Sequence, residues 1–130
     1  MNDLIWSTDV QGRFTYLSPQ FKTLLGWDEN QWLGKPLLRL THPQDRPLLR
    51  AEYQAIIAGE KTLSHLECRY RHQQDRYLWV RVSATAIKNA EGAVVQFQGI
   101  LSDISNLKEA EIALQASENR FRKVFDSNKE

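Results

Sequence analysis

The sequence has little cysteine, little net charge and no long apolar run, and each scarcity excludes a class of protein. Cys68 is the only cysteine in 130 residues, so no internal disulfide can form, which fits a reducing compartment. The formal net charge is +1, so no overall field attracts nucleic acid or an acidic membrane surface. No apolar run is long enough to span a bilayer. These features predict a cytoplasmic domain without nucleic-acid or membrane contact.

Catalytic and metal-binding motifs are also missing from the sequence. It contains no Gly-rich phosphate loop, no Gly-x-Ser-x-Gly turn and no His-Glu-x-x-His pair. The three histidines and the single cysteine are scattered and do not match the spacing of zinc ligands. We therefore expect neither an enzyme nor a metal site within this chain.

The pattern of apolar residues predicts one domain of the α+β class. Two short apolar runs at 4–8 and 13–17 are followed by short helical segments and by an amphipathic helix over 44–58. Alternating apolar and polar residues then predict three long strands, at 62–71, 76–88 and 93–104. This order favours an antiparallel sheet that helices cover on one face.

From residue 105 the pattern becomes that of a helix with a narrow apolar seam. Its members recur at alternating three- and four-residue steps, as at the a and d positions of a coiled coil, and they are Leu107, Ala110, Leu114, Phe121 and Val124. Ser117 interrupts the seam. A domain of this size offers such a helix little to pack against, so we expect a homodimer formed through it. The alternative is that the helix folds back onto its own sheet.

Several short stretches, taken in their order, resemble the PAS family with its C-terminal PAC region. The matching stretches are residues 6–12, 24–27, 32–36, 42–45, 67–69, 77–80 and 102–105. The resemblance implies a five-stranded antiparallel sheet with helices across one face and a ligand pocket between the sheet and helix 44–58. It makes residues 1–105 the PAS/PAC sensor domain and residues 106–130 a signalling helix or linker. Residues 117–127 are similar to the start of a further PAS domain.

The resemblance also implies a hinge between the last strand and the C-terminal helix, formed by Asp103, Ile104 and Ser105. In relatives the aspartate at this place bonds to nearby backbone and basic groups. The sequence departs from the family at the turn between the third and fourth strands, where Asp75 takes the usual place of glycine. Aspartate tolerates a left-handed backbone better than most residues, so we expect the turn to be kept.

The residues expected to line the pocket are almost all apolar, and only the two tyrosines and the cysteine offer polar atoms. They are Tyr53, Ile56, Ile57, Leu66, Cys68, Tyr70, Val80, Val82, Ala84, Val95, Phe97 and Leu101. One interpretation is a closed core filled by these side chains. The other is a pocket for a small apolar or aromatic ligand, in the room left by Cys68 and Ala84.

Two cofactors known in the family are disfavoured by the residues. Light-sensing relatives carry a reactive cysteine in a Gly-Arg-Asn-Cys-Arg-Phe motif before the long helix, whereas Cys68 lies on a predicted strand. Haem-binding relatives mostly take their axial histidine from the long helix, and residues 44–58 contain no histidine. His42 lies in the turn before that helix, where a structural role is favoured. No cofactor is therefore expected.

The function implied by the resemblance is sensory and regulatory. The domain would relay a signal through its C-terminal helix, by rearrangement of a dimer, to an output domain outside this chain. In relatives that output is a histidine kinase, as in two-component systems, or a cyclic-dinucleotide synthase, so adjacent PAS and output domains are the expected partners. Two alternatives stay open at this point: a receptor for a small molecule or cofactor, and a passive dimerisation spacer.

Overall fold

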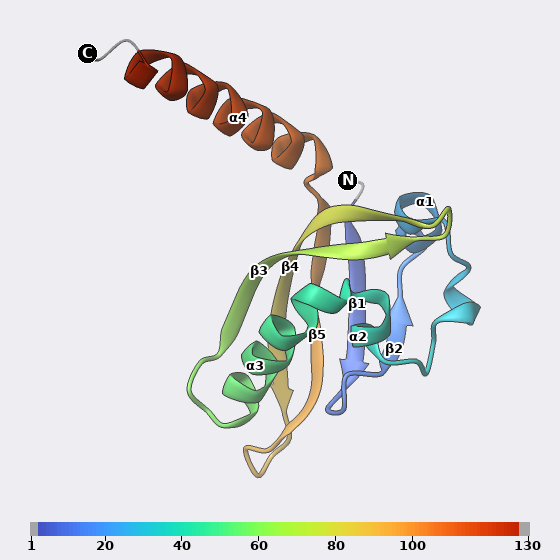
Figure 1. Ribbon diagram of the computed structural model, residues 1–130. Helices are drawn as coiled ribbons and strands as arrows, with labels where there is room; N and C mark the ends of the chain where they lie inside the picture. Colours follow the sequence, from blue (N-terminus) through green and yellow to red (C-terminus); the bar gives the residue numbers. More distant parts are fainter. Residues whose placement is uncertain (1–2, 128–130) are drawn as a thin grey trace.

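The computed structural model describes residues 3–127, which form a curved sheet, a set of short helices and one long helix (Figure 1). In chain order the elements are β1 (Leu4–Asp9), β2 (Phe14–Leu17), α1 (Gln20–Leu25), η1 (Glu29–Gln31), α2 (Leu37–Leu40), η2 (Pro43–Asp45), α3 (Arg46–Ile57), β3 (Leu63–His72), β4 (Arg76–Lys88), β5 (Val94–Asp103) and α4 (Ser105–Ser127). The helix predicted over 44–58 is therefore divided into the 3-10 turn η2 and the helix α3.

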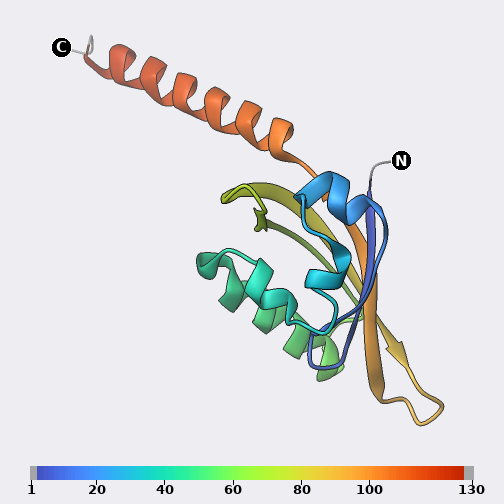
Figure 2. The ribbon, with the colours of Figure 1, turned by 90° about the vertical axis from the view of Figure 1, so that its right-hand side faces the viewer.

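The five strands form one sheet in the order β2-β1-β5-β4-β3, and every neighbouring pair is antiparallel. Seen edge-on, α2 and α3 lie on one side of the sheet, and α4 projects away from the domain (Figure 2). The prediction of an α+β fold with a five-stranded antiparallel sheet, helices across one face and a C-terminal helix is confirmed. The last strand, β5, lies at the centre of the sheet, so α4 begins beside the core.

The core lies between the sheet and the helices, because alternate strand residues point to this side. Cys68 and Val80 are completely buried there, and Phe97 and Leu101 are almost so. The helices contribute buried residues as well, namely Phe21, Leu25, Leu40, Leu49 and Ile56. Burial of such side chains stabilises the fold by about 1.5–3 kcal/mol each.

The prediction that Val95 points into the core is wrong. The pairing of β4 with β5 aligns Ile87 with Gln96 but Lys88 with Val94, so Val95 has no partner across the ladder. One extra residue of this kind is a β-bulge, and it reverses the alternation of side chains beyond it. Val95 is therefore 45% exposed, and Val94 packs against the core in its place.

The turn between β3 and β4 keeps its shape without glycine. Asp75 has a φ of 61° and is the only non-glycine residue of the described part of the chain with a positive φ. This is the left-handed conformation expected from the sequence, and aspartate accepts it at moderate cost.

Gly99 is required where β5 passes between its two neighbours. It pairs with Trp6 on one side and with Ala84 on the other. A Cβ atom at this position would lie 1.7 Å from the Ser83 carbonyl oxygen and 2.9 Å from the Trp6 ring. Glycine therefore lets the buried Trp6 indole lie close against the middle of the sheet.

Candidate functional site

The structure brings most of the predicted pocket residues together between the sheet and α3. Those in or packed against the core cluster are Tyr53, Ile56, Leu66, Cys68, Tyr70, Val80, Val82, Ala84, Phe97 and Leu101. The Tyr53 and Phe97 rings are in edge contact, with centroids 4.9 Å apart and an interplanar angle of 63°. Ile57 and Val95 lie outside this cluster, Val95 because of the bulge and Ile57 because it is at the exposed end of α3.

Ile57 nevertheless lines a surface pocket of about 310 Å³, between the β1–β2 turn, α2 and α3. Tyr53 and Phe97 form part of its wall, so the pocket adjoins the core at one end of the sheet. Leu37, Arg50 and Gln54 also line it and were missed from the sequence. A signal for two of them existed, because positions 50, 53, 54 and 57 follow the i, i+3, i+4, i+7 spacing of one helix face.

Burial controls the titration of the polar groups in this interior. It raises the pKa of the Cys68 thiol to about 12 and holds the pKa of the Tyr53 and Tyr70 hydroxyls above its usual range. All three groups are therefore neutral at physiological pH, and Cys68 is a poor nucleophile. Two further buried atoms, Trp6 Nε1 and Thr8 Oγ1, have no hydrogen-bond partner within the described part of the chain.

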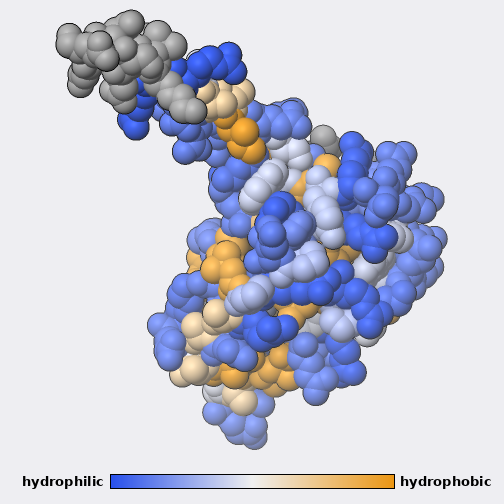
Figure 3. All heavy atoms as spheres, in the orientation of Figure 1, coloured by the Kyte–Doolittle hydropathy of each residue, from blue (hydrophilic) through white to orange (hydrophobic). Residues whose placement is uncertain are grey.

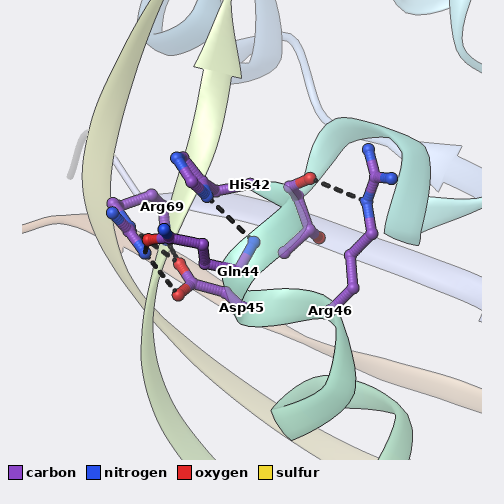
Figure 4. A network of polar contacts seen from close by, with 6 residues as sticks. His42, Gln44, Asp45, Arg46 and Arg69 are labelled. Carbon is purple, nitrogen blue, oxygen red and sulfur yellow. Dashed lines mark hydrogen bonds and ion pairs between the residues drawn. The ribbon is translucent and has the colours of Figure 1, made fainter.

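An ion pair connects the beginning of α3 to β3 (Figure 4). The Arg69 guanidinium donates from Nη2 to Asp45 Oδ1 at 2.8 Å and from Nε to Oδ2 at 3.1 Å, and its backbone N–H donates to Oδ2 at 2.8 Å. Burial alone would raise the pKa of the Asp45 carboxyl, but the hydrogen bonds and charge of Arg69 outweigh it and lower that pKa. His42 Nδ1 accepts from the Gln44 N–H at 3.0 Å, a structural role as expected.

The predicted hinge is held to β4 through the backbone of Trp79. The Ile104 N–H donates to the Trp79 carbonyl at 2.9 Å, and the Ser105 hydroxyl lies 3.5 Å from the same oxygen. Asp103 Oδ1 accepts from the Ser105 N–H at 2.8 Å. Asp103 thus bonds to backbone, but the ion pairs of the described residues do not include it. Ile104 is buried, which fixes the exit of α4.

A second set of charges ties the first turn of α4 to the sheet. Lys108 Nζ lies 2.7 Å from Glu67 Oε1, and Arg81 Nη2 lies 3.1 Å from Glu67 Oε2. The Lys108 ammonium also lies 5.1 Å from the centroid of the Trp79 ring, and the Arg69 guanidinium lies 5.2 Å from it. Contacts therefore run without interruption from η2 through Arg69, Trp79 and Lys108 to α4.

Beyond this turn α4 leaves the sheet, and its seam is uncovered. Leu107 is 47% exposed and Leu114 is 62% exposed, and Ala110 is also exposed. Figures 1 and 2 show the helix projecting away from the domain, so the alternative in which it folds back onto the sheet is wrong. The side chains of Phe121 and Val124 lie outside the described part of the structure.

Within residues 3–127, no helix is both long and apolar enough to cross a membrane. The same residues contain no group of three or more histidine, cysteine or acidic side chains that could hold a metal ion.

The fold is similar to that of several solved structures. A sensory box histidine kinase/response regulator from Burkholderia thailandensis E264 is 26% identical, with a TM-score of 0.78 over 94% of this chain and 92% of that one. The N-terminal domain of a diguanylate cyclase with a PAS/PAC sensor from Marinobacter aquaeolei is 24% identical, with a TM-score of 0.71 over 82% of this chain and 98% of that one. The second likeness shows the fold alone.

Sequence comparison leads to the same family. The family model described as PAS fold matches residues 14–101, and the chain belongs to this family, whose members are sensory domains of signalling proteins. A blue-light-activated histidine kinase of Rhizobium johnstonii is 30% identical over 106 residues, and an uncharacterized protein of Sinorhizobium fredii is 26% identical over 121 residues. The alignments cover 82% and 93% of this chain but only 30% and 14% of those proteins.

Proposed function

We propose that residues 1–105 are a sensor unit and that residues 106–130 carry its signal to a partner domain, by rearrangement of a homodimer. The observation that carries this proposal is the uncovered seam on α4, a helix whose first turn is tied to the sheet. Apolar side chains on a projecting helix are stabilised only if another surface covers them. A second copy of the same helix offers a matching seam.

The contacts from α3 to α4 support a relay. Asp45 joins the beginning of α3 to Arg69, and Trp79 lies between Arg69 and Lys108. A shift of α3 would therefore displace the first turn of α4, because these side chains are in contact with one another. Two arrangements of the helix pair would then form the two signalling states.

The names of the relatives suggest the output. They include histidine kinases and a diguanylate cyclase, so we propose an output domain of one of these types, with further PAS domains in the same protein. We also propose a cytoplasmic location, and a domain that binds neither haem nor photochemically active flavin. The protonated, buried thiol of Cys68 on β3 supports the last point.

The oligomeric state tests the dimer. We expect the chain to dimerise reversibly in analytical ultracentrifugation, since a helix of this length pairs weakly. Leu114→Glu, on the seam, should weaken the dimer at least about tenfold. Ile112→Glu is the matched control, because Ile112 is similarly exposed, at 58%, but lies off the seam, and this variant should weaken the dimer less. A chain that stays monomeric at millimolar concentration, or equal effects of the two variants, would contradict the proposed seam.

The relay is tested in the protein that carries the output domain. Asp103→Ala removes the bond to the Ser105 N–H and should uncouple output activity from the signal while the domain stays folded by circular dichroism. A passive spacer would instead keep its regulation unchanged in this variant, and it would also tolerate the pocket-filling change Ala84→Leu.

A further inference from the structure

We propose that the pocket lined by Tyr53, Phe97 and Arg50 binds a small monocarboxylate with an apolar body. The inference concerns the nature of the signal, and its importance for output rests on the proposed sensory function. Binding itself can be measured without any output domain. The argument proceeds from the size of the pocket to its wall, its charge and its inner end.

The size of the pocket limits the ligand. A volume of about 310 Å³ holds about ten non-hydrogen atoms if each takes the space of one water molecule, about 30 Å³. This is smaller than a nucleotide, a flavin or a haem. It matches a carboxylic acid with about eight carbon atoms, either as a chain or as a ring with a short side arm.

The wall of the pocket is apolar. Leu37 is almost fully buried behind it, and the edge-on pair of Tyr53 and Phe97 forms a broad aromatic surface. Ile57 lies at the mouth, where it is 48% exposed. Hydrophobic surface (orange) gathers in the lower part of the face that α3 covers, among hydrophilic side chains (Figure 3). An apolar ligand body would remove this surface from water.

The charge of the lining selects an anion. Arg50 alone is charged among the described residues that line the pocket, and the ion pairs of the described residues do not include it. Its guanidinium can hold a carboxylate with two parallel hydrogen bonds. Gln54, four positions further along α3, adds an amide donor. A single cation in a lining without acidic residues favours one carboxylate over a dicarboxylate or an amine.

At the Phe97 end of the pocket, behind the residues that line it, lies a buried hydroxyl without a partner in the described part of the chain. Thr8 is fully buried, and its Oγ1 has no hydrogen-bond partner within the described part of the chain. Its neighbour across the ladder is Phe97, and the residue two positions further along the chain is Val10, both of which line the pocket. An unpaired buried hydroxyl is unfavourable, so a ligand or a water molecule that reached this end would stabilise the protein.

Binding can be tested by titration calorimetry with two acids of the right size, octanoate and phenylacetate, and with their neutral amides, octanamide and phenylacetamide. We expect at least one acid to bind with a dissociation constant below about 1 mM, and at least about tenfold more tightly than its amide. The acid that binds more tightly tells whether the natural ligand is aliphatic or aromatic. If neither acid binds, or if acids and amides bind equally, the proposal is overturned.

Two pairs of variants assign the binding to this pocket. Arg50→Gln should remove the preference for the acid, whereas Arg39→Gln, at an exposed arginine of α2 outside the pocket lining, should keep it. Ile57→Trp should fill the mouth and weaken both acids at least about tenfold, whereas Ile112→Trp on α4 should not. Binding that survives both Arg50→Gln and Ile57→Trp places the ligand elsewhere and overturns the proposal. The dimer and relay experiments do not depend on these results.

Discussion

The sheet domain and α4 contain apolar residues of the same kinds but differ in how far they bury them. Leu101 on β5 is 1% exposed, whereas Leu114 on α4 is 62% exposed. Every strand pairs with a neighbour and turns one face toward helices, so the apolar side chains on that face are buried within the chain. The apolar side chains of α4 have no such cover. The comparison shows that the sheet domain carries the stability of the chain, and that α4 has a surface available for association.

The largest effect is expected at Gly99, where the sheet is most closely packed. Gly99→Ala would place a Cβ atom against the Ser83 carbonyl, so the strands must separate, and we expect a loss of at least about 3 kcal/mol in the free energy of unfolding. Gly92→Ala is the control. Unlike Gly99, Gly92 has a positive φ, of 83°, but it has open space around it, so Gly92→Ala should lose only about 1–2 kcal/mol, from backbone strain alone. Urea denaturation of both variants measures the difference, and similar losses would show that the strands can adjust.

The next prediction compares two leucines directly. Leu101→Ala should lower the free energy of unfolding by about 3 kcal/mol, because it leaves a cavity in the core. Leu114→Ala should lower it by less than about 0.5 kcal/mol at concentrations where the chain is monomeric. Thermal unfolding followed by circular dichroism gives both values. A large effect of Leu114→Ala in the monomer would mean that α4 packs on its own domain. Leu114 and Leu101 would then both be buried within the chain, and the two regions would not differ.

A smaller effect is expected where α3 is joined to β3. Asp45→Asn should lose about 2 kcal/mol at pH 7, since it weakens charged hydrogen bonds from Arg69. The folded protein holds the pKa of Asp45 below the ordinary value of 3.8. The ionised Asp45 carboxyl therefore makes its full contribution to the free energy of unfolding above pH 3.8. This contribution is lost as the pH falls through the lower pKa of the folded state. The difference in the free energy of unfolding between wild type and variant should thus begin to narrow below about pH 4 and close only below the folded pKa.

Urea denaturation at pH 7 and at pH 3 measures this gap. Asp75→Asn is the control, because the Asp75 side chain is 89% exposed and its ion pair with Arg71 is long, at 3.4 Å. It should change stability little at either pH. A loss for Asp45→Asn that stays the same at pH 3 would show that the charge of Asp45 is not what joins α3 to the sheet.

The smallest effect on stability is expected at the contact between the two regions. Lys108→Gln breaks the ion pair with Glu67, which as a surface pair contributes about 0.5 kcal/mol. Amide hydrogen exchange in the first turn of α4 should nevertheless become faster, because this turn loses its side-chain tie to the sheet. Lys88→Gln is the control, since the ion pairs of the described residues do not include Lys88. Equal exchange in the two variants would show that Trp79 and Ile104 alone hold the turn.

Much of the fold could be predicted from the sequence because its signals are local. Alternation along 62–71 and 76–88 follows from the two faces of a strand. The left-handed turn at Asp75 was expected because the resemblance to the PAS family places this residue where glycine is usual. The bulge at Val95 could not be predicted, because it depends on how β5 pairs with Lys88 and Ile87 on another strand. The alternating pattern continues smoothly through 95, so the sequence carries no sign of the extra residue.

The candidate site was predicted less completely than the fold. The strand residues of the core follow from alternation, but a pocket at the end of a sheet is formed by segments that only the tertiary fold brings together. Arg50 is polar and exposed, so it resembles any residue on the outer side of a helix until the β1–β2 turn is placed beside it. Its helical spacing from Tyr53 could be recognised in the sequence. That this face of the helix lines a pocket could not, because the β1–β2 turn that completes the pocket is far away in the chain.

The ion pair of Asp45 with Arg69 has a further consequence, for the solubility of the protein. β3 is an edge strand, and the open N–H and C=O groups of an edge invite other chains to add a strand and aggregate. Here Asp45 accepts from the Arg69 N–H, the His42 N–H donates to the Arg69 carbonyl, and the Trp27 indole donates to the Arg71 carbonyl. On the opposite edge, Phe14 of β2 exchanges hydrogen bonds with Gly34 and Lys35. The chain itself thus occupies part of each edge, at Arg69 and Arg71 on β3 and at Phe14 on β2, which shortens the stretch of open backbone that another chain could pair with.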